Sequence, residues 1–293
     1  MDKKLFSGAS TALITPFNDD GSVNYKKFEE LLDLQLKSDM SAVIVCGTTA
    51  ETPTLTDDEK NELIRIAVDK CKNKIQVVVG TGCNDTRKSF KMTENATKLG
   101  ADSVLVITPY YNKTSQKGLY EHYKFISEAT DKPIIVYNVP SRTGMTINLE
   151  TYVKLQEINN IKGIKEASGD LSLLAALIDC CGKRFNYYCG NDDIILPFLS
   201  LGGDGIISVI GNLIPKETSE LCNAYFMGNI SRSAELQIKY TPLINALFAE
   251  VSPMPIKYAM NKMNFSVGKC RLPLTDITQD TANRIDRELE ILS

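Results

Sequence analysis

The sequence predicts an α/β protein, a (β/α)8 barrel of the TIM type with a C-terminal helical extension. Short runs rich in Val and Ile recur along the first three quarters of the 293-residue chain, and amphipathic segments separate them. Runs that are apolar on both faces are typical of parallel strands covered on both sides. About eight strand-and-helix units in some 230 residues match a closed barrel.

The eight predicted strands are the short apolar runs. They span Thr11–Ile14, Ala42–Cys46, Ile75–Val79, Ser103–Ile107, Pro133–Tyr137, Ile161–Ile164, Phe185–Cys189 and Gly205–Ile210. The amphipathic segments predict helices at Tyr25–Lys37, Asp57–Lys72, Thr86–Leu99, Leu119–Ala129, Leu171–Cys181 and Asp193–Leu201. An open doubly wound sheet has the same rhythm, but its Gly-x-Gly-x-x-Gly motif is missing, because Asp85 stands where the third glycine belongs.

The strand pattern stops near Asn229, and three helical segments follow it. They span Arg232–Ala249, Pro255–Asn264 and Asp276–Ile291. Proline is tolerated at a helix start, because the first turn has no intrahelical partner for an N–H group. We therefore predict a catalytic barrel over residues 1–228 and a three-helix extension over residues 229–293.

The charge balance and the hydropathy pattern exclude several kinds of partner. The chain has 33 Lys and Arg against 36 Asp and Glu, a net charge of -3, so it lacks the basic surplus that binds nucleic acid. We find no signal peptide and no apolar run long enough to cross a bilayer. The sequence predicts a cytoplasmic protein with neither a nucleic-acid nor a membrane partner.

Cysteine and histidine usage excludes further kinds of site. The eight cysteines include no C-x-x-C pair, which argues against structural zinc. Any histidine-dependent triad or metal site would have to use His122, the one histidine, which we interpret as a surface residue of a helix. We predict that no metal is bound and that other side chains carry the chemistry.

Polar residues follow the carboxyl end of every predicted strand. They are Thr15-Pro16, Gly47-Thr48-Thr49, Gly80-Thr81-Gly82, Thr108-Pro109-Tyr110-Tyr111, Tyr137-Asn138, Lys165-Glu166, Gly190-Asn191-Asp192 and Ser208. In a barrel these ends share one rim, where barrel active sites are built. The clustering favours an active site over a non-catalytic scaffold.

Lys165 is the most informative of the rim residues. Alternation along a strand places Gly163 and Lys165 on one face and Glu166 on the other, toward the helices. If the first face points into the barrel, Gly163 leaves space below the amine. Desolvation lowers a lysine pKa, and a neutral amine attacks a ketone to form a Schiff base. The alternative is a rim lysine paired with a carboxylate.

Four other polar residues are candidates for the same site. Tyr137 could exchange a proton with a substrate, or be a buried tyrosine bonded to a backbone carbonyl. Thr48 and Thr49 beside Gly47 suit a proton relay or a carboxylate site, although capping a turn is a competing use. Arg142 could bind a carboxylate through two hydrogen bonds, although most loop arginines are only solvated.

Several of these motifs together resemble the dihydrodipicolinate synthase family. They are Gly47-Thr48-Thr49-Ala50-Glu51, Thr108-Pro109-Tyr110-Tyr111-Asn112, Tyr137-Asn138-Val139-Pro140-Ser141-Arg142-Thr143-Gly144, Gly163-Ile164-Lys165-Glu166-Ala167, Gly203-x-Gly205-Ile206-Ile207-Ser208-Val209 and Arg271-Leu272-Pro273-Leu274. The resemblance covers essentially the whole chain. It implies a homo-oligomeric lyase, a tetramer built from tight dimers, that condenses pyruvate with L-aspartate 4-semialdehyde in diaminopimelate and lysine biosynthesis.

The resemblance also implies roles for the candidate catalytic residues. Lys165 matches the lysine that forms a covalent Schiff base with pyruvate, so no separate cofactor is expected. Tyr137 matches the residue that transfers protons, and Thr48 and Tyr111 complete the proton relay. Tyr111 would reach across a two-fold interface into the partner's site, with Tyr110 stacking in the contact itself. An extended segment would direct these neighbouring tyrosines to opposite sides.

The resemblance assigns four residues to substrate binding. Thr49 would hold the carboxylate of pyruvate, Arg142 would receive the carboxylate of the aldehyde, and Gly190 and Ile207 would line the site through their backbones. Ala50 departs from the family pattern, which has a second glycine at this position. If this position requires a positive φ, the alanine costs about 1 kcal/mol.

Two other functions remain open from the sequence. N-acetylneuraminate lyase and the keto-deoxy-sugar acid aldolases share the barrel and its lysine, although the context of Arg142 favours a short dicarboxylate-like product. A non-catalytic keto-acid sensor would not need Lys165, Tyr137 and Thr48 together.

Regulation by lysine is a further expectation from the resemblance. Lysine-inhibited members place acidic and histidine side chains around a lysine pocket at the subunit interface. The matching positions here are Lys88, Asp57 and Lys60. A cation at position 88 repels the ammonium groups of lysine, so we predict weak or absent feedback inhibition.

Overall fold

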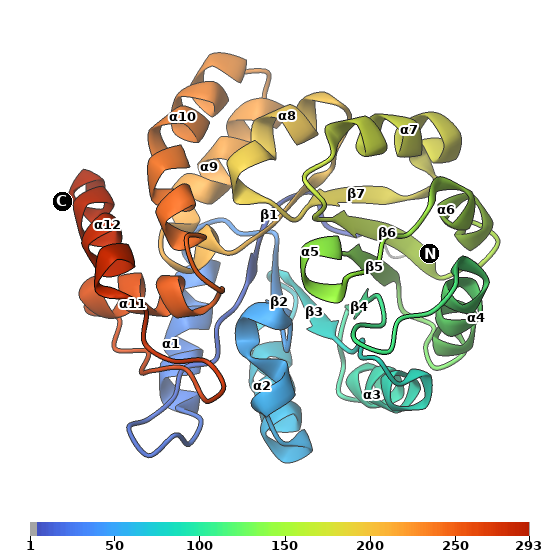
Figure 1. Cartoon of the computed structure of the whole chain (residues 1–293), viewed down its shortest axis with the longest axis horizontal. Helices are drawn as coiled ribbons and strands as arrows, with labels where there is room; N and C mark the ends of the chain where they lie inside the picture. Colours follow the sequence, from blue (N-terminus) through green and yellow to red (C-terminus); the bar gives the residue numbers. More distant parts are fainter. Residues whose placement is uncertain (1–4, 293) are drawn as a thin grey trace.

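A computed structural model describes residues 5–292 and has eight parallel strands in a closed barrel, paired in chain order (Figure 1). The strands are β1 (Gly8–Ala12), β2 (Ala42–Val45), β3 (Gln76–Gly80), β4 (Ser103–Ile107), β5 (Ile134–Asn138), β6 (Ile161–Glu166), β7 (Asn186–Cys189) and β8 (Gly205–Ser208). β1 pairs with both β2 and β8, which closes the barrel. The predicted (β/α)8 fold is confirmed.

Helices surround the barrel (Figure 1). The α-helices are α1 (Tyr25–Leu36), α2 (Asp57–Cys71), α3 (Thr86–Lys98), α4 (Gln116–Ser127), α5 (Pro140–Thr143), α6 (Leu149–Leu155), α7 (Leu171–Cys181), α8 (Ile195–Ser200), α9 (Pro215–Phe226), α10 (Ile230–Leu247), α11 (Met254–Lys262) and α12 (Gln279–Leu289). The 3-10 turns are η1 (Thr48–Ala50), η2 (Thr52–Thr54), η3 (Gly182–Arg184), η4 (Asp192–Ile194), η5 (Ile210–Asn212) and η6 (Glu290–Leu292).

Local side-chain caps begin several of the helices that the sequence predicts. Thr56 caps α2 and forms a reciprocal capping box with Glu59. Asp85 accepts two backbone N–H bonds at the start of α3, and Asp170 does the same for α7. These caps fix the residues at which the helices begin, in the segments that follow the carboxyl ends of β2, β3 and β6.

Two apolar layers hold the barrel together. The larger layer lies between the strands and the helices, and the smaller one fills the barrel interior with side chains such as Leu5, Ile135 and Tyr188. The Phe6 ring stacks on the Tyr188 ring with centroids 4.3 Å apart, and the Tyr188 hydroxyl donates to the Phe6 carbonyl at 2.7 Å. The segment before β1 therefore closes one end of the barrel.

The predicted elements differ from the observed ones in their boundaries and in three omissions. β1 lies at Gly8–Ala12 rather than Thr11–Ile14, and α4 begins at Gln116 rather than Leu119. Strand β6 continues through Lys165 and Glu166, so these residues end the strand instead of following it. The predicted elements omit α5, α6 and α9; α5 and α6 span only four and seven residues, which is too short for a clear helical period.

The last three helices lie together on one side of the barrel (Figure 1). They are α10, α11 and α12, as the sequence predicts, with ends shifted by one to three residues. The predicted division after residue 228 falls in the turn between α9 and α10. The division into a catalytic barrel over residues 1–228 and a helical extension over residues 229–293 stays a prediction.

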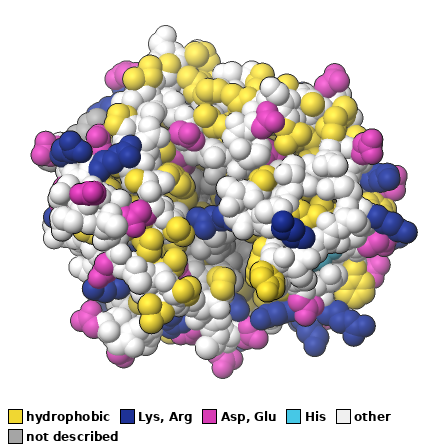
Figure 2. All heavy atoms as spheres, viewed as in Figure 1, with side chains coloured by type: hydrophobic (Ala, Val, Ile, Leu, Met, Phe, Trp, Pro, Cys, Tyr) yellow, Lys and Arg dark blue, Asp and Glu magenta, His cyan; other side chains and the backbone are white. Residues whose placement is uncertain are grey.

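Figure 2 shows a hollow near the centre of the face viewed in Figure 1. Figure 2 shows acidic and basic side chains distributed around the edge of this face. Within residues 5–292, no helix combines the length and the apolar character that crossing a bilayer requires.

Candidate active site

Lys165 lies in the barrel interior at the end of β6. Its side chain is buried, with 6% of the residue exposed, and its Nζ lies 4.3 Å from the centroid of the Tyr137 ring. The two residues are register partners on neighbouring strands β5 and β6. Burial lowers the pKa of the Lys165 amine to about 8; the Asp192 carboxylate opposes this shift and the Arg142 charge adds to it. The amine is therefore partly neutral near physiological pH.

Tyr137 and Thr48 form a contact beside this amine. Burial raises the pKa of the Tyr137 phenol to about 12, while the Arg142 charge and a hydrogen bond with the Thr48 side chain act in the opposite direction. The phenol thus has a hydroxyl partner in the cavity. Tyr137 stays protonated at neutral pH, which is the state in which it can donate a proton.

A small cavity of about 170 Å³ brings most of the candidate residues together. Its lining includes Thr48, Thr49, Tyr137, Arg142, Lys165 and Gly190. They come from the segments after β2, β5 and β7 and from strands β5 and β6. The rim arrangement that the sequence predicts therefore places these side chains around one space.

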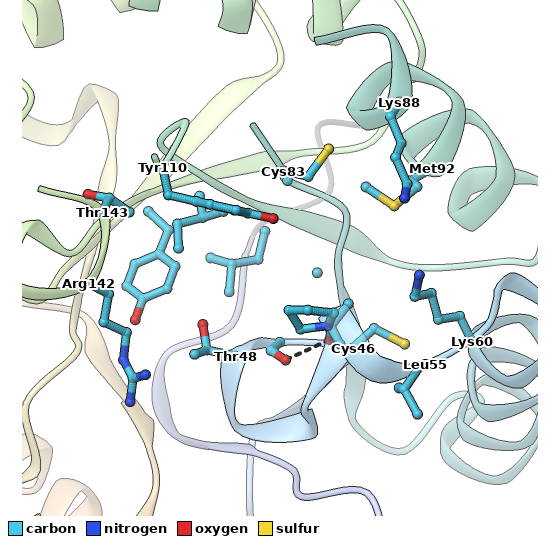
Figure 3. A pocket seen from close by; sticks show the side chains of 18 of the residues that line it. Cys46, Thr48, Leu55, Lys60, Cys83, Lys88, Met92, Tyr110, Arg142 and Thr143 are labelled. Atoms are coloured by element: carbon cyan, nitrogen blue, oxygen red, sulfur yellow. Dashed lines mark hydrogen bonds between the residues drawn. The ribbon is translucent and has the colours of Figure 1, made fainter. Parts of the chain in front are cut away.

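Arg142 enters the cavity from the short helix α5. Its Nη2 donates to the Ser252 carbonyl at 3.1 Å, so the segment between α10 and α11 orients the guanidinium. The side chain also borders the larger cavity next to the site, where Figure 3 shows it near Thr48. Its position is that of a group able to bind a carboxylate of a molecule entering from this larger cavity.

Glu166 points away from the cavity, as the strand alternation predicts. Its carboxylate accepts from Asn138 Nδ2 at 3.0 Å and from the Tyr152 hydroxyl of α6 at 3.2 Å. Burial raises the pKa of this carboxyl group, and the hydrogen bonds from Ser168 and Asn138 oppose the shift. Glu166 ties β5, β6 and α6 together beside the site.

Gly163 does not leave open space below Lys165, and this prediction from the sequence is wrong. A Cβ atom at Gly163 would lie 2.9 Å from Leu5 Cδ1 and 3.2 Å from Ile135 Cγ1. The barrel-interior side chains already fill this volume, so glycine is needed for their close approach. The face containing Gly163 and Lys165 does point into the barrel.

Asp192 acts on the Lys165 amine through its charge, a role that the sequence did not predict. It is buried after β7, and its Oδ2 accepts from the backbone N–H groups of Val209 and Ile210 at 2.9 and 3.0 Å. The sequence does place Asp192 at the rim, in Gly190-Asn191-Asp192. Its burial beside Lys165 depends on the segment after β8, which is distant in the sequence, so the residues around Asp192 do not predict it.

His122 is not the surface residue predicted from the sequence. It lies on α4, but it is only 4% exposed, and its Nδ1 lies 2.8 Å from the Thr86 hydroxyl. Burial lowers the pKa of the imidazole to about 4. The packing of α4 against α3 accounts for this burial, and the residue lies outside the cavity around Lys165.

Comparison with known proteins places this architecture in one family. The model of the dihydrodipicolinate synthetase family matches residues 5–292. The chain belongs to the dihydrodipicolinate synthetase family. It is 48% identical over 286 residues to a 4-hydroxy-tetrahydrodipicolinate synthase of Clostridium perfringens, and the match covers 98% of each chain.

Solved structures of family members have the same fold. A dihydrodipicolinate synthase from Thermotoga maritima matches with a TM-score of 0.95 and 42% identity, covering 98% of each chain. A chloride-inhibited dihydrodipicolinate synthase from Acinetobacter baumannii, complexed with pyruvate, matches with a TM-score of 0.95 and 38% identity, covering 97% of this chain and 98% of that one.

The departure from the family pattern at Ala50 carries no conformational cost here. Ala50 lies inside the η1 turn and has no positive φ; the positive φ values near this turn, each 56°, fall on Cys46 and Glu51. The cost that would follow from a left-handed alanine therefore does not arise.

Two of the expected family site residues lie outside the small cavity. Tyr111 is 92% exposed, and Ile207 is buried in the barrel interior beside that cavity, whose lining includes Val209 instead. The extended backbone predicted for the tyrosines is wrong at Tyr111, where φ is 66°. The side chains do face different surroundings, since Tyr110 lines the larger cavity.

The larger cavity, of about 490 Å³, is lined by Asp57, Lys60 and Lys88, the three residues that the resemblance assigns to the position of a lysine pocket. Lys60 from α2 and Lys88 from α3 reach toward each other across it (Figure 3). Asp57 Oδ1 lies 3.2 Å from Lys60 Nζ and compensates one of the two charges. Thr48 and Tyr137 border both cavities, so the two spaces adjoin at these residues.

Proposed function

We propose that this protein is a pyruvate-dependent lyase with 4-hydroxy-tetrahydrodipicolinate synthase activity. It condenses pyruvate with L-aspartate 4-semialdehyde on the way to diaminopimelate and lysine. The observation that carries the proposal is a buried lysine of lowered pKa beside a tyrosine, in a cavity that also holds a threonine pair and an arginine. The relatives that bear this activity in their names support it.

The first step is formation of a Schiff base at Lys165. The neutral amine attacks the keto carbon of pyruvate, the carbonyl oxygen leaves as water, and a C=N bond forms. Thr49, which lines the same cavity, holds the pyruvate carboxylate. Tyr137 and Thr48 form the hydrogen-bonded pair that moves protons to the leaving oxygen, which is the role that the protonated phenol suits.

The second step makes a new carbon–carbon bond. Loss of a methyl proton turns the imine into an enamine, whose carbon attacks the aldehyde of L-aspartate 4-semialdehyde. The amino group of that substrate then attacks the imine carbon, which closes a ring and frees the Lys165 amine. Arg142 binds the carboxylate of this second substrate, a group that the polyol chains of sugar acids do not supply at this place.

The proposal needs no separate cofactor, because the covalent imine at Lys165 serves as the electron sink. We also propose that the enzyme works in the cytoplasm as a homo-oligomer, a tetramer built from tight dimers. In this assembly Tyr111 completes the proton relay of the neighbouring site. Gly190 and Ile207 line the site through their backbones.

Trapping the imine tests the proposed function. Incubation with pyruvate and borohydride should add one reduced pyruvyl group, and peptide mass spectrometry should locate it at Lys165. A matched control is Lys162→Gln, which removes a lysine of the same strand on the opposite face and should leave the adduct unchanged. Absence of an adduct, or its location at another lysine, would contradict the mechanism.

A further inference from the structure

A buried ion pair joins helix α11 to the turn that carries Thr48 and Thr49. Lys257 Nζ lies 2.6 Å from Glu51 Oε1, and the two side chains are only 2% and 1% exposed. The other carboxylate oxygen accepts the backbone N–H of Arg271 at 2.8 Å. Both charged groups lose their hydration when they are buried. Each is therefore stabilised by the opposite charge and by its own hydrogen bonds.

Lys257 is held on two further sides. Its Nζ donates to the Lys269 carbonyl at 3.0 Å and lies 4.1 Å from the centroid of the Phe17 ring. The Arg271 guanidinium lies over the same ring at 4.4 Å and donates to the Thr54 carbonyl at 2.8 Å. The chain after α11 thus contacts both ends of the segment from Glu51 to Thr54.

Glu51 occupies a strained position directly after the threonine turn. Its backbone is left-handed, with φ 56° and ψ 35°, an uncommon conformation for a residue with a side chain. Such a conformation persists where the surroundings determine it. Here the Thr54 hydroxyl donates to the Glu51 carbonyl at 2.9 Å, and the Thr15 hydroxyl donates to the Ala50 carbonyl at 2.8 Å.

We infer that Lys257 and Glu51 are positioning residues that hold the Thr48–Thr49 turn at the mouth of the barrel. Neither lines the small cavity around Lys165, so they act through the turn. Without the Lys257 ammonium group, the buried Glu51 carboxylate is left unpaired. It becomes solvated if it rotates toward water, and this rotation displaces the Thr48–Thr49 turn. The inference rests on the proposed function only for the roles of the two threonines.

Hydrogen exchange tests the inference without any assay of activity. Lys257→Met keeps an unbranched chain over the Phe17 ring but removes the charge. The amides of Ala50, Glu51 and Thr54, which donate within the turn, should exchange at least tenfold faster. Peptides from the barrel strands should be unchanged. The control is Lys262→Met, which removes an exposed lysine of the same helix, paired with Asp286, and should leave the turn protected.

A double-mutant cycle tests whether the pair acts through Thr48. Lys257→Met should lower kcat about 30-fold in the wild-type background but less than threefold in Thr48→Val, since the group being positioned is already lost. A general loss of folding would lower kcat by the same factor in both backgrounds. Both measurements are made at a temperature where circular dichroism shows the variants folded.

The outcomes separate this inference from the proposed function. Unchanged exchange in the turn, or an equal loss of kcat in both backgrounds, would overturn the positioning role. Should Lys257→Met fail to fold, Glu51→Gln removes the opposite charge at constant shape and is subjected to the same measurements. A wild-type protein without an adduct at Lys165 would refute the proposed function, and the exchange result would still decide the inference.

Discussion

Lys165 and Lys257 are both buried, yet their neighbours give them different chemistry. Burial lowers the pKa of each amine, but at Lys257 a carboxylate 2.6 Å away opposes the shift. Lys165 makes no ion pair within the described residues 5–292 and faces the Tyr137 ring and the cavity. The first lysine is suited to an ion pair that holds structure, and the second to attack on a carbonyl group.

The pH dependence of imine formation follows from the environment of Lys165. Because the pKa of this amine is about 8, the neutral fraction should rise about tenfold per pH unit below 8 and level off above it. The rate of adduct formation should follow the same curve. Asp192→Asn removes the negative charge that favours the ammonium form, so the midpoint should move to lower pH. Stopped-flow measurement of imine formation checks this.

The matched control for this experiment is Asp193→Asn, which removes the neighbouring exposed carboxylate. Its midpoint should equal that of the wild type within experimental error. A midpoint for Asp192→Asn that stays in place or moves upward would show that this carboxylate does not act on the amine.

Arg142→Ala should separate the two substrates. A charge-assisted hydrogen bond contributes about 1.5 to 3 kcal/mol, so kcat/KM for L-aspartate 4-semialdehyde should fall roughly 10- to 100-fold. The pyruvate adduct at Lys165 should form nearly as in the wild type. Steady-state kinetics and borohydride trapping measure the two effects. Equal losses in both steps would mean that the role of Arg142 is misassigned.

At the scale of elements, the first turns of α2 and α3 determine the charge of the larger cavity. Each helix begins at a side-chain cap, at Thr56 and Asp85, and each sends one lysine into the cavity within its first turn. With Asp57 close to Lys60, the charge at Lys88 has no compensating ion pair among the described residues. We therefore expect the positive charge of this cavity to disfavour a bound cation.

Free lysine should inhibit this enzyme weakly or not at all. Its ammonium groups would be placed near Lys60 and Lys88, and like charges disfavour such a complex. Initial rates measured with increasing lysine at constant ionic strength should stay level through the micromolar range. Lys88→Glu reverses the local charge and should increase sensitivity. Inhibition of the wild type by micromolar lysine would contradict the prediction.

For the molecule as a whole, a single chain does not explain how Tyr111 could take part in catalysis. It is 92% exposed at a left-handed position, although the family resemblance assigns it to a proton relay. A residue so exposed can serve a buried site only if a second chain brings that site to it. The predicted symmetric dimer would do this, because each chain would lend Tyr111 to its partner.

Mixed dimers test this arrangement. Lys165→Ala and Tyr111→Phe each should be poorly active, but a dimer of one chain of each kind has one site with both native residues. After joint unfolding and refolding, activity should rise above the average of the parents. Each variant refolded alone is the control. No rise, with mixed dimers confirmed by native mass spectrometry, would place Tyr111 outside the partner's site.

The sequence by itself determined the barrel and the set of candidate residues. Strand alternation placed Lys165 inside and Glu166 outside, and both positions agree with the structure. These features could be predicted because they depend on local periodicity and on residues that follow one another in the chain.

Only the tertiary structure decided what surrounds each residue. The volume below Lys165 is filled by Leu5 and Ile135, His122 is buried between helices, and Lys257 reaches Glu51 from more than 200 residues away in the chain. Burial, pKa shifts and ion pairs arise from side chains that distant segments bring together. No local pattern contains that information, because each contact is fixed only when the barrel closes and the last helices pack on it.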